Sequence, residues 1–316
     1  MTGIEGYRIY RELGRSGDRA GDAPRTSGAP GDARVYLATE RQSNRPMALK
    51  VIELGDDADL LARDRAWRRA RRVARLDHPN AVKVYDVGLE GSALYVAMEH
   101  LQGGDLSARL RAGVSFVDIL RITEQLANAL DHAHAKGCLH GDVTPSNILF
   151  RDPGAAVLVD FAGGALGDLD PGSAPGRVRV VGTPGYMSPE QAAGRGCDAR
   201  SDLYGLGVVF FQMLTGDTPH PPEHEGGTVI RHPAAAAPRL PERFAALQEL
   251  VDGLLAPLPE KRFQSGAEVV RALDAVRFED VTPQPALVRA LVATSEIEVL
   301  AAAMEPRRDG GRTRLD

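Results

Sequence analysis

The segment HGDVTPSNIL at residues 140–149, followed eleven residues after its end by Asp160-Phe161, is the most informative stretch of this sequence. Transfer of a phosphoryl group from ATP needs a carboxylate that accepts the proton of the attacking hydroxyl. It also needs oxygen ligands for the magnesium ion on the phosphates. Asp142 can supply the first group, and Asn147 and Asp160 can supply the second. The pattern therefore indicates phosphoryl transfer from ATP.

With these motifs the chain resembles the Hanks-type serine/threonine protein kinases, the eukaryotic-like kinases of bacteria, from about Tyr7 to Val276. The resemblance implies an α+β, bilobal protein kinase fold, with a small β-rich N-lobe that has one main helix and a larger α-helical C-lobe. It implies ATP-dependent phosphorylation of protein Ser/Thr hydroxyls in bacterial signalling, with ATP and Mg²⁺ bound. The implied partner is a protein substrate or signalling protein.

The resemblance implies specific roles along a nucleotide cleft. Ala48 and Lys50 in MALK match the strand whose lysine pairs with the α and β phosphates. Met98, Glu99 and Leu101 match the gatekeeper and the hinge that contacts adenine, and Asp105 matches a ribose contact. Further implied ATP contacts are Gly14, Val35 and Leu149. Asp142 is the implied base, Thr144 an accessory catalytic residue, and Asn147 and Asp160 the metal ligands.

The arginine content of the chain makes Lys50 more informative. Of 38 basic residues, only Lys50, Lys83, Lys136 and Lys261 are lysine. A lysine stands at the position where a compact ammonium is expected, although arginine fills almost every other basic position. This observation favours nucleotide binding.

Downstream motifs distinguish a protein kinase from antibiotic and choline kinases, which share the HGDxxxxN pattern. The segment GTPGYMSPE at residues 182–190 resembles the peptide-positioning loop of protein kinases. Asp202 matches the buried aspartate of the next helix, and Arg262 matches the arginine that pairs with Glu190. Val73, His140, Phe161 and Asp202 fit the hydrophobic spine of the family. The interpretation as a small-molecule phosphotransferase is supported only by residues 140–142.

Apolar patterning predicts the order of elements. Short segments rich in Val, Ile, Leu and Tyr predict strands at 7–13, 34–39, 47–52, 82–87 and 93–98. Helical spacing of apolar residues predicts helices at 57–76, 116–136, 201–215, 242–256 and 265–276.

These elements divide the chain into a kinase domain at 1–278 and a C-terminal extension at 279–316, whose end we expect to be disordered. The N-lobe spans about 7–100 and the C-lobe about 101–278. Residues 15–33, rich in Gly, Pro, Ala and Asp, predict a flexible insertion in the glycine-rich loop.

Composition limits the other functions. A net charge of -5 argues against nucleic-acid binding, which usually needs a basic surface. The two cysteines suit a reducing compartment, and the start lacks the pattern of a signal peptide. The most apolar stretch, 203–214, is too short for a transmembrane helix, which takes about 20 residues. We expect a cytoplasmic protein, and the sequence leaves its oligomeric state open.

A second group of residues invites a metal-binding interpretation. His132, His134, Cys138 and His140 are all potential ligands. However, His132 and His134 lie about 200° apart around a helix and cannot bind one ion together. We therefore interpret the group as a helix end followed by the catalytic loop.

Several positions depart from the family pattern. The insertion separates Gly14 from Val35 and removes the glycine-rich signature. Ala162 replaces the glycine after Asp160-Phe161, and Thr144 stands where a lysine usually meets the γ-phosphate. Gly141 replaces an arginine that clamps a phosphorylated loop, and Ser173 is the one hydroxyl residue in 163–181, so activation by loop phosphorylation is not expected.

The departure with the largest consequence is Arg69. Counting back from Leu76-Asp77-His78-Pro79, it aligns with the helix glutamate that should pair with Lys50. Arg69 either points at the nucleotide phosphates or Asp160, or it belongs to a solvated basic face of a helix that is swung out. The leading functional prediction is an active kinase. The alternative is a pseudokinase scaffold that binds partners with or without nucleotide.

Overall fold

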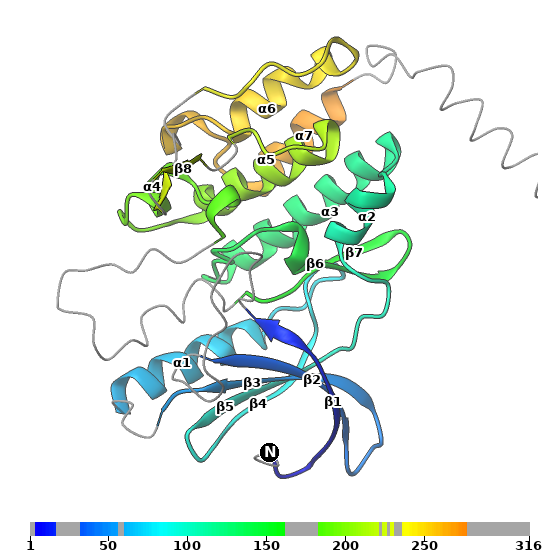
Figure 1. The fold of residues 1–316 in the computed structure, drawn as a ribbon, viewed down its shortest axis with the longest axis vertical. Coiled ribbons are helices and arrows are strands. Elements are labelled where there is room, and N and C mark those ends of the chain that lie inside the picture. Colours follow the sequence, from blue (N-terminus) through cyan, green and yellow to red (C-terminus); the bar gives the residue numbers. More distant parts are fainter. Residues whose placement is uncertain are drawn as a thin grey trace, which may run out of the picture.

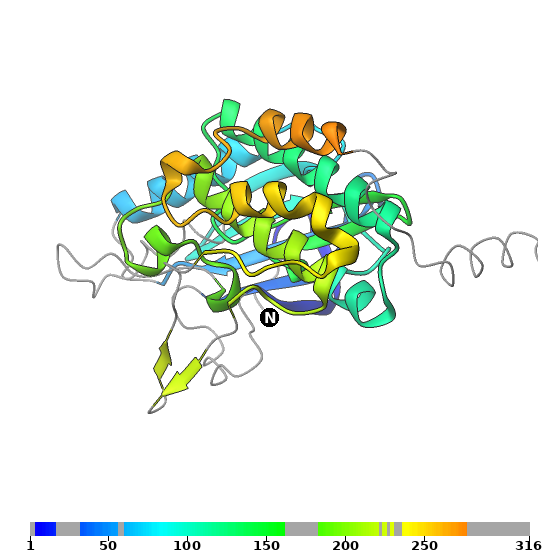
Figure 2. The same cartoon turned by 90° about the horizontal axis from the view of Figure 1, so that it is seen from above.

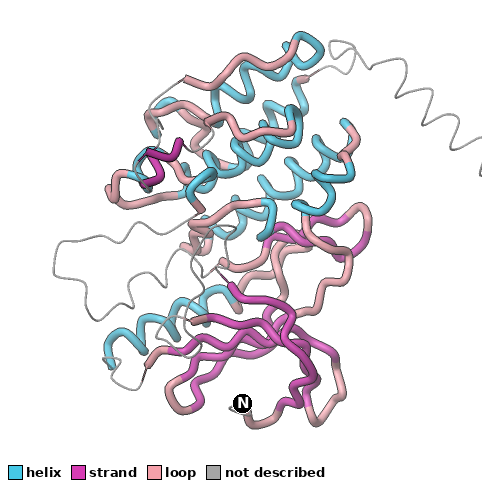
Figure 3. Tube along the Cα trace, in the orientation of Figure 1, coloured by secondary structure: helices cyan, strands magenta, loops and turns pink. Residues whose placement is uncertain are grey.

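The computed structural model consists of two lobes, one built on a β-sheet and one built of helices (Figure 1). It describes residues 4–16, 32–55, 60–161, 183–220, 223–225, 228–230 and 236–276. The five strands of the large sheet form one lobe, and the long helices, except α1, lie in the other together with short strand pairs (Figure 3). Ala162, Ser173 and the extension 279–316 lie outside the described residues.

The N-lobe sheet is antiparallel with the strand order β1-β2-β3-β5-β4. Its strands are β1 (Tyr7–Ser16), β2 (Ala33–Glu40), β3 (Pro46–Glu53), β4 (Val84–Glu90) and β5 (Ala93–Met98). All five strands predicted from the sequence are confirmed. Residues 47–52 of the central strand β3 are buried in succession, because the sheet is covered on both faces.

The predicted insertion begins later and ends earlier than expected. Pairing of β1 with β2 continues through Gly14 with Val35 to Ser16 with Ala33. Arg15, Ser16 and Ala33 therefore belong to the strands and not to the loop, and residues 17–31 lie outside the described ranges. The paired strands hold Gly14 and Val35 opposite each other, as a glycine-rich hairpin requires.

Helix α1 (Leu60–Val73) packs against the sheet through its small residues (Figure 1). Ala66 and Ala70 are buried against Ile52, Leu54 and Leu94. Their short side chains let the helix lie close to the sheet. The helix predicted at 57–76 ends earlier than expected, at Val73. Residues 57–59 lie outside the residues that the structure describes.

The C-lobe is organised around two long helices, α3 (Phe116–Ala135) and α5 (Ala199–Thr215), which confirm the predictions of 116–136 and 201–215. Helix α5 is buried along almost its whole length, starts at the capping residue Asp198 and ends at Gly216 with φ 91°. The apolar stretch noted in the sequence is thus a core helix. None of the helices in the described ranges is both long and apolar enough to cross a membrane.

Figure 2 shows the C-lobe helices stacked over the sheet lobe, and the C-lobe has further short elements besides α3 and α5. They are α2 (Leu106–Ala112), η1 (Pro145–Asn147), β6 (Ile148–Asp152), β7 (Ala155–Leu158), η3 (Pro184–Tyr186), α4 (Pro189–Ala192), β8 (Glu223–Glu225), β9 (Thr228–Ile230), η4 (Glu242–Leu247), α6 (Gln248–Leu254), η5 (Pro259–Lys261) and α7 (Gly266–Ala275). Helix α7 confirms the prediction of 265–276.

The prediction of one helix at 242–256 was wrong in part. A 3-10 helix, η4, precedes α6, and Phe244 within η4 has the non-helical φ of -117°. Leu247 and Leu250 still face the core, which explains why the apolar spacing resembled one continuous helix. The short elements α2, β6 and β7 were not predicted, although β6 and β7 form the hairpin that carries Leu149.

Candidate active site

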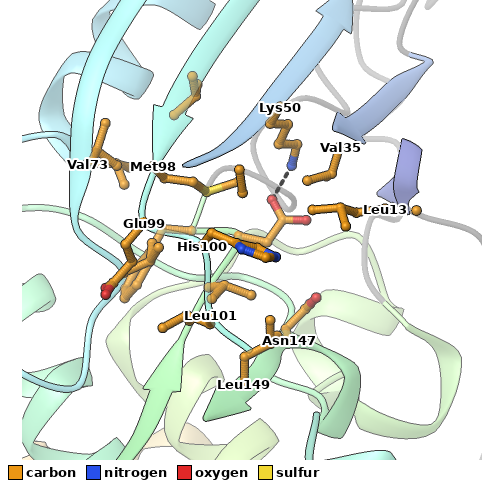
Figure 4. Close-up of a pocket in the computed structure, with 18 of the residues that line it drawn as sticks. Leu13, Val35, Lys50, Val73, Met98, Glu99, His100, Leu101, Asn147 and Leu149 are labelled. Carbon is orange, nitrogen blue, oxygen red and sulfur yellow. Dashed lines mark hydrogen bonds and ion pairs between the residues drawn. The ribbon is translucent and has the colours of Figure 1, made fainter. Parts of the chain in front are cut away.

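A cavity of about 460 Å³ lies between the lobes (Figure 4). It brings together every nucleotide-binding and metal-binding residue expected from the sequence. These are Gly14, Val35, Ala48, Lys50, Met98, Glu99, Leu101, Asp105, Asn147, Leu149 and Asp160. The residues come from both lobes and from positions far apart in the chain, so the fold assembles one site from the separate motifs.

One end of the cavity is an apolar slot. Val35 and Ala48 lie on adjacent strands of the N-lobe sheet, and Leu149 lies on the hairpin of the C-lobe (Figure 4). Met98 pairs with Ala48 across β3 and β5, and Leu101 follows at the end of the hinge. Apolar walls on both sides suit a flat aromatic base.

His100 also lines this end of the cavity, and sequence reasoning missed it (Figure 4). Burial, with a smaller contribution from the positive charge of Arg11, lowers the pKa of His100. The imidazole is therefore neutral near pH 7. Its position between Glu99 and Leu101 was the sequence signal that could have identified it.

The side chain of Glu99 points to a structural partner. Arg151 on β6 donates to both carboxylate oxygens of Glu99, at 2.8 and 3.0 Å, and to the carbonyl of Pro79 at 2.8 Å. The backbone N–H of Lys83 donates to the same carboxylate at 2.8 Å. Glu99 therefore positions the hinge with its side chain. Its backbone N–H donates to the carbonyl of Lys83 at 2.9 Å, so the carbonyl of Glu99 is the backbone group that it can offer to a nucleotide.

We expect Arg151→Ala to lower the free energy of unfolding by about 1 kcal/mol, since the pair is bidentate but Arg151 is partly exposed. Urea denaturation of Arg151→Ala, Glu99→Gln and the double variant would measure the coupling between the two residues. Additive effects of the two single changes would contradict the direct ion pair.

Asp105 has a role in the fold as well as a place in the cavity. It is the N-cap of α2, and its Oδ1 accepts a hydrogen bond from the N–H of Ala108 at 2.7 Å. The backbone of Asp105 also forms an isolated antiparallel β-bridge with Leu149. The helix cap thus holds the second carboxylate oxygen near the cavity, where a ribose hydroxyl can donate to it.

At the other end of the cavity Lys50 forms an ion pair with Asp160 (Figure 4). Lys50 is 5% exposed, and Asp160 adopts the left-handed φ of 67°, which aspartate tolerates better than most residues. The following residue, Phe161, is buried and packs edge-to-face on His140 at 4.9 Å between ring centroids. This packing anchors Asp160 in the cavity.

The catalytic loop holds Asp142 by hydrogen bonds on both oxygens. Its Oδ1 accepts from the backbone N–H of Thr183 at 2.7 Å. Asn147 donates its Nδ2 to the carbonyl of Asp142 at 2.8 Å and to Oδ2 at 3.3 Å. The contact from Thr183 was not predicted, because a backbone donor 41 residues away leaves no local sequence signal.

Beneath the loop, buried Asp202 fixes the backbone. Its carboxylate accepts from the N–H groups of His140 at 2.9 Å and Gly141 at 2.7 Å, and it contacts His134 Nε2 at 2.7 Å. His140 in turn contacts the carbonyl of Val159 at 2.7 Å. The spine role expected for His140, Phe161 and Asp202 therefore corresponds to direct contacts.

Thr144 is buried next to Ser146 in the loop that carries Asp142. It is 1% exposed, and its hydroxyl forms a hydrogen bond with Ser146 at 2.9 Å. Ser146 lines the cavity, whereas the described lining includes neither Thr144 nor Asp142. Ser146 thus adds a hydroxyl group to the cavity wall, next to Asn147.

The oxygen donors in the cavity fit a magnesium ion. Because Asn147 uses its Nδ2 on Asp142, its amide oxygen is the atom that it can offer to a metal. Asp160 adds a carboxylate in the same cavity. Amide and carboxylate oxygens, together with substrate phosphates and water, form the usual environment of protein-bound Mg²⁺.

The histidine and cysteine group noted in the sequence is distributed among separate partners. His132 accepts a hydrogen bond from the N–H of Asp77, His134 contacts Asp202, and His140 contacts Val159. Cys138 is buried, and burial raises the pKa of its thiol. The described residues contain no group of three such side chains arranged around a metal.

Helix α1 presents four residues to the cavity: Ala66, Arg69, Ala70 and Val73. Arg69 is half-buried there, whereas Arg65, Arg68 and Arg72 on the same helix are exposed. The single acidic residue of α1, Asp64, pairs with Arg68 on the exposed side. Arg69 thus faces the cavity, while the exposed arginines form the solvated basic face.

The segment that begins at Thr183 packs against the C-lobe through several hydrogen bonds. Ser188 caps α4 and forms a capping box with Gln191, whose Nε2 donates to the carbonyl of Gly141. Tyr186 donates to Gln212 on α5 at 2.7 Å. The peptide-positioning segment is therefore tied to both the catalytic loop and α5.

Known proteins resemble this chain in sequence and structure. Residues 26–272 match the protein kinase domain family. The serine/threonine-protein kinase PknJ of Mycobacterium tuberculosis is 34% identical over 298 residues, covering 89% of this chain and 48% of PknJ. PrkC of Bacillus subtilis is 31% identical over 268 residues, covering 81% of this chain and 41% of PrkC. The chain thus spans less than half the length of these relatives.

Among solved structures, the kinase domain of Mycobacterium tuberculosis PknI is similar with a TM-score of 0.63 at 27% identity. The similarity covers 87% of this chain and 98% of that domain.

Proposed function

This chain belongs to the protein kinase domain family, among bacterial serine/threonine protein kinases, and we propose that it transfers the γ-phosphate of Mg-ATP to Ser or Thr hydroxyls of a protein substrate. Family and fold confirm the resemblance inferred from the motifs. The observation that carries the proposal is the assembly of Lys50, Asn147 and Asp160 in one cavity, with Asp142 hydrogen-bonded to Asn147.

In this proposal, the apolar slot holds adenine, and backbone groups of the hinge at Glu99 and Leu101 form hydrogen bonds with the edge of the adenine ring. Lys50 would bind phosphate oxygens after releasing Asp160. Asp160 and Asn147 would hold a magnesium ion, which would neutralise charge on the phosphates. Asp142 then orients the substrate hydroxyl and accepts its proton. The N–H of Thr183 and the amide of Asn147 fix the orientation of that carboxylate.

The substrate is proposed to bind along the segment Thr183–Glu190. Thr183 links this segment to Asp142 directly, so a peptide bound there would lie next to the base. Because ATP is a cytoplasmic metabolite, we also propose that this domain acts in the cytoplasm.

A second function, that of a pseudokinase scaffold, is favoured by one observation. Lys50 pairs with Asp160, and the cavity-facing residues of α1 include no acid to position Lys50 for phosphate. A scaffold would bind partners, with or without nucleotide, without transferring phosphate.

Transfer of label from γ-labelled ATP tests the two functions. The purified chain would be incubated with Mg-ATP and a generic protein substrate, beside the Asp142→Asn variant. We expect label on Ser or Thr with the wild type and its loss with the variant. No transfer combined with stabilisation by Mg-ATP in a thermal shift assay would favour the scaffold. The absence of both label transfer and stabilisation would overturn ATP binding altogether.

A further inference from the structure

The phosphate end of the cavity carries an unusual charge distribution. Lys50 from β3, Arg69 from α1 and Asp160 from the segment before Phe161 all line this cavity. Counted over these three described residues, two cations and one carboxylate leave one net positive charge before any metal binds. A glutamate in place of Arg69 would instead leave one net negative charge.

The position of Arg69 follows from the helix itself. The four cavity-facing residues, Ala66, Arg69, Ala70 and Val73, follow the i, i+3, i+4, i+7 spacing of one helix face. The two alanines are buried against the sheet, which keeps this face close to β3 and β5. Arg69 is the charged residue among the four, so α1 presents an arginine to the cavity that Lys50 also lines.

The chemistry of these groups selects a phosphate ligand. A guanidinium presents planar, paired N–H donors that match phosphate oxygens, whereas a lysine acts as a point charge. The pair of Lys50 with Asp160 neutralises the carboxylate that would otherwise repel phosphates in the absence of metal. Among the described residues, Lys50 and Arg69 therefore offer two cations to an anion with several phosphates in this cavity, even without Mg²⁺.

We propose that Arg69 is a phosphate-binding residue that contacts the β or γ phosphate of ATP, and that it makes nucleotide binding by this chain only weakly dependent on Mg²⁺. The proposal rests on the proposed function, because it assigns a residue to the same nucleotide site. In this chain α1 contributes a phosphate ligand of its own, in place of an acid that orients Lys50.

Calorimetric titration of the 316-residue chain with ATP, ADP and adenosine, each in Mg²⁺ and in EDTA, tests this assignment. The variants are Arg69→Ala, Arg69→Glu and the matched control Arg72→Ala. Arg72 lies one turn further along α1, is exposed and is outside the cavity lining. Its loss removes the same charge from the same helix.

We expect wild-type affinity for ATP in EDTA to lie within tenfold of that in Mg²⁺. Arg69→Ala should weaken ATP binding in EDTA at least tenfold, or about 1.4 kcal/mol, and ADP binding less. Adenosine affinity should change less than twofold, and Arg72→Ala should match the wild type. Arg69→Glu should make ATP binding depend on Mg²⁺ by a hundredfold or more.

Two results would overturn the assignment while leaving the kinase function intact. One is unchanged ATP affinity in Arg69→Ala under both conditions. The other is an equal loss for adenosine and ATP, which would mean that the substitution disturbs the cavity as a whole. If neither ATP nor adenosine binds to the wild type, the proposed function fails together with the inference.

Discussion

Asp142→Asn is expected to lower kcat for protein phosphorylation by about 10²–10⁴-fold, the usual contribution of a positioned general base, with little change in KM for ATP. An amide cannot accept the proton of the substrate hydroxyl, but it has nearly the same shape as the carboxylate. The nucleotide cavity is lined by other residues, so ATP binding should persist.

The contacts of Asp142 allow this substitution to be interpreted. The Oδ1 of the new side chain can still accept from the N–H of Thr183, and Asn147 keeps its bond to the backbone carbonyl of residue 142. The bond from Asn147 to Oδ2 is lost. We therefore expect a small loss of stability and a large loss of turnover.

Steady-state kinetics of Asp142→Asn, beside the remote control Asp274→Asn on α7, would measure this effect. Asp274 is exposed and lies far along the chain from the catalytic loop. Unchanged kcat in Asp142→Asn would remove Asp142 from the reaction. A parallel loss in Asp274→Asn would point to a general effect on folding.

Arg262→Met is expected to destabilise the C-lobe by about 3–5 kcal/mol, because it removes one partner of a buried ion pair. The side chain of Arg262 has no exposed area, and Glu190 is 12% exposed. Arg262 donates to both oxygens of Glu190, at 2.7 and 2.8 Å, and to the carbonyls of Ala256, Arg200 and Pro257. All five N–H groups of its guanidinium are thereby satisfied.

The same site gives an expected pH dependence. Burial tends to raise the pKa of Glu190, but hydrogen bonds from Arg262 and Ser201 outweigh it and lower the pKa from 4.5 to about 2. A depressed pKa in the folded state contributes stability that is present above the unfolded value and is lost as the pH falls toward 2. Glu190→Gln should reduce this loss between about pH 5 and pH 2.

Urea denaturation of Arg262→Met at neutral pH, and of Glu190→Gln across this pH range, would test both effects. The control is Arg271→Ala on α7, an exposed arginine whose loss should cost less than about 0.5 kcal/mol. An equal effect of Arg262→Met and Arg271→Ala would show that the ion pair does not stabilise the fold.

Sequence patterns were most successful where local chemistry is distinctive. The motif at 140–149, the lysine in MALK and the apolar strands identified the fold and most of the cavity, because these roles demand particular residue types at fixed spacings. They were less successful at short elements: α2 has seven residues and β7 only four, too few to show a clear periodicity.

Contacts between distant segments could not be predicted from the sequence for a different reason. Arg151 is one of many arginines, and nothing near it in the sequence indicates that it meets Glu99 and Pro79. Thr183 contributes a backbone N–H, which every residue except proline possesses. Thr144 and Ser146 are both hydroxyl residues, and only the turn of η1 decides that Ser146 faces the cavity.

The sequence by itself determined the family and the order of the motifs, and it predicted the reacting groups, since each of these depends on residue type and spacing. The tertiary structure decided where Arg69 points, which partner Lys50 has and what holds Asp142 in place. These depend on how α1, the hinge and the segment after Thr183 pack together. The charge at the phosphate end depends on side chains from three separate segments, those of Lys50, Arg69 and Asp160. No local sequence pattern predicts that these three lie together.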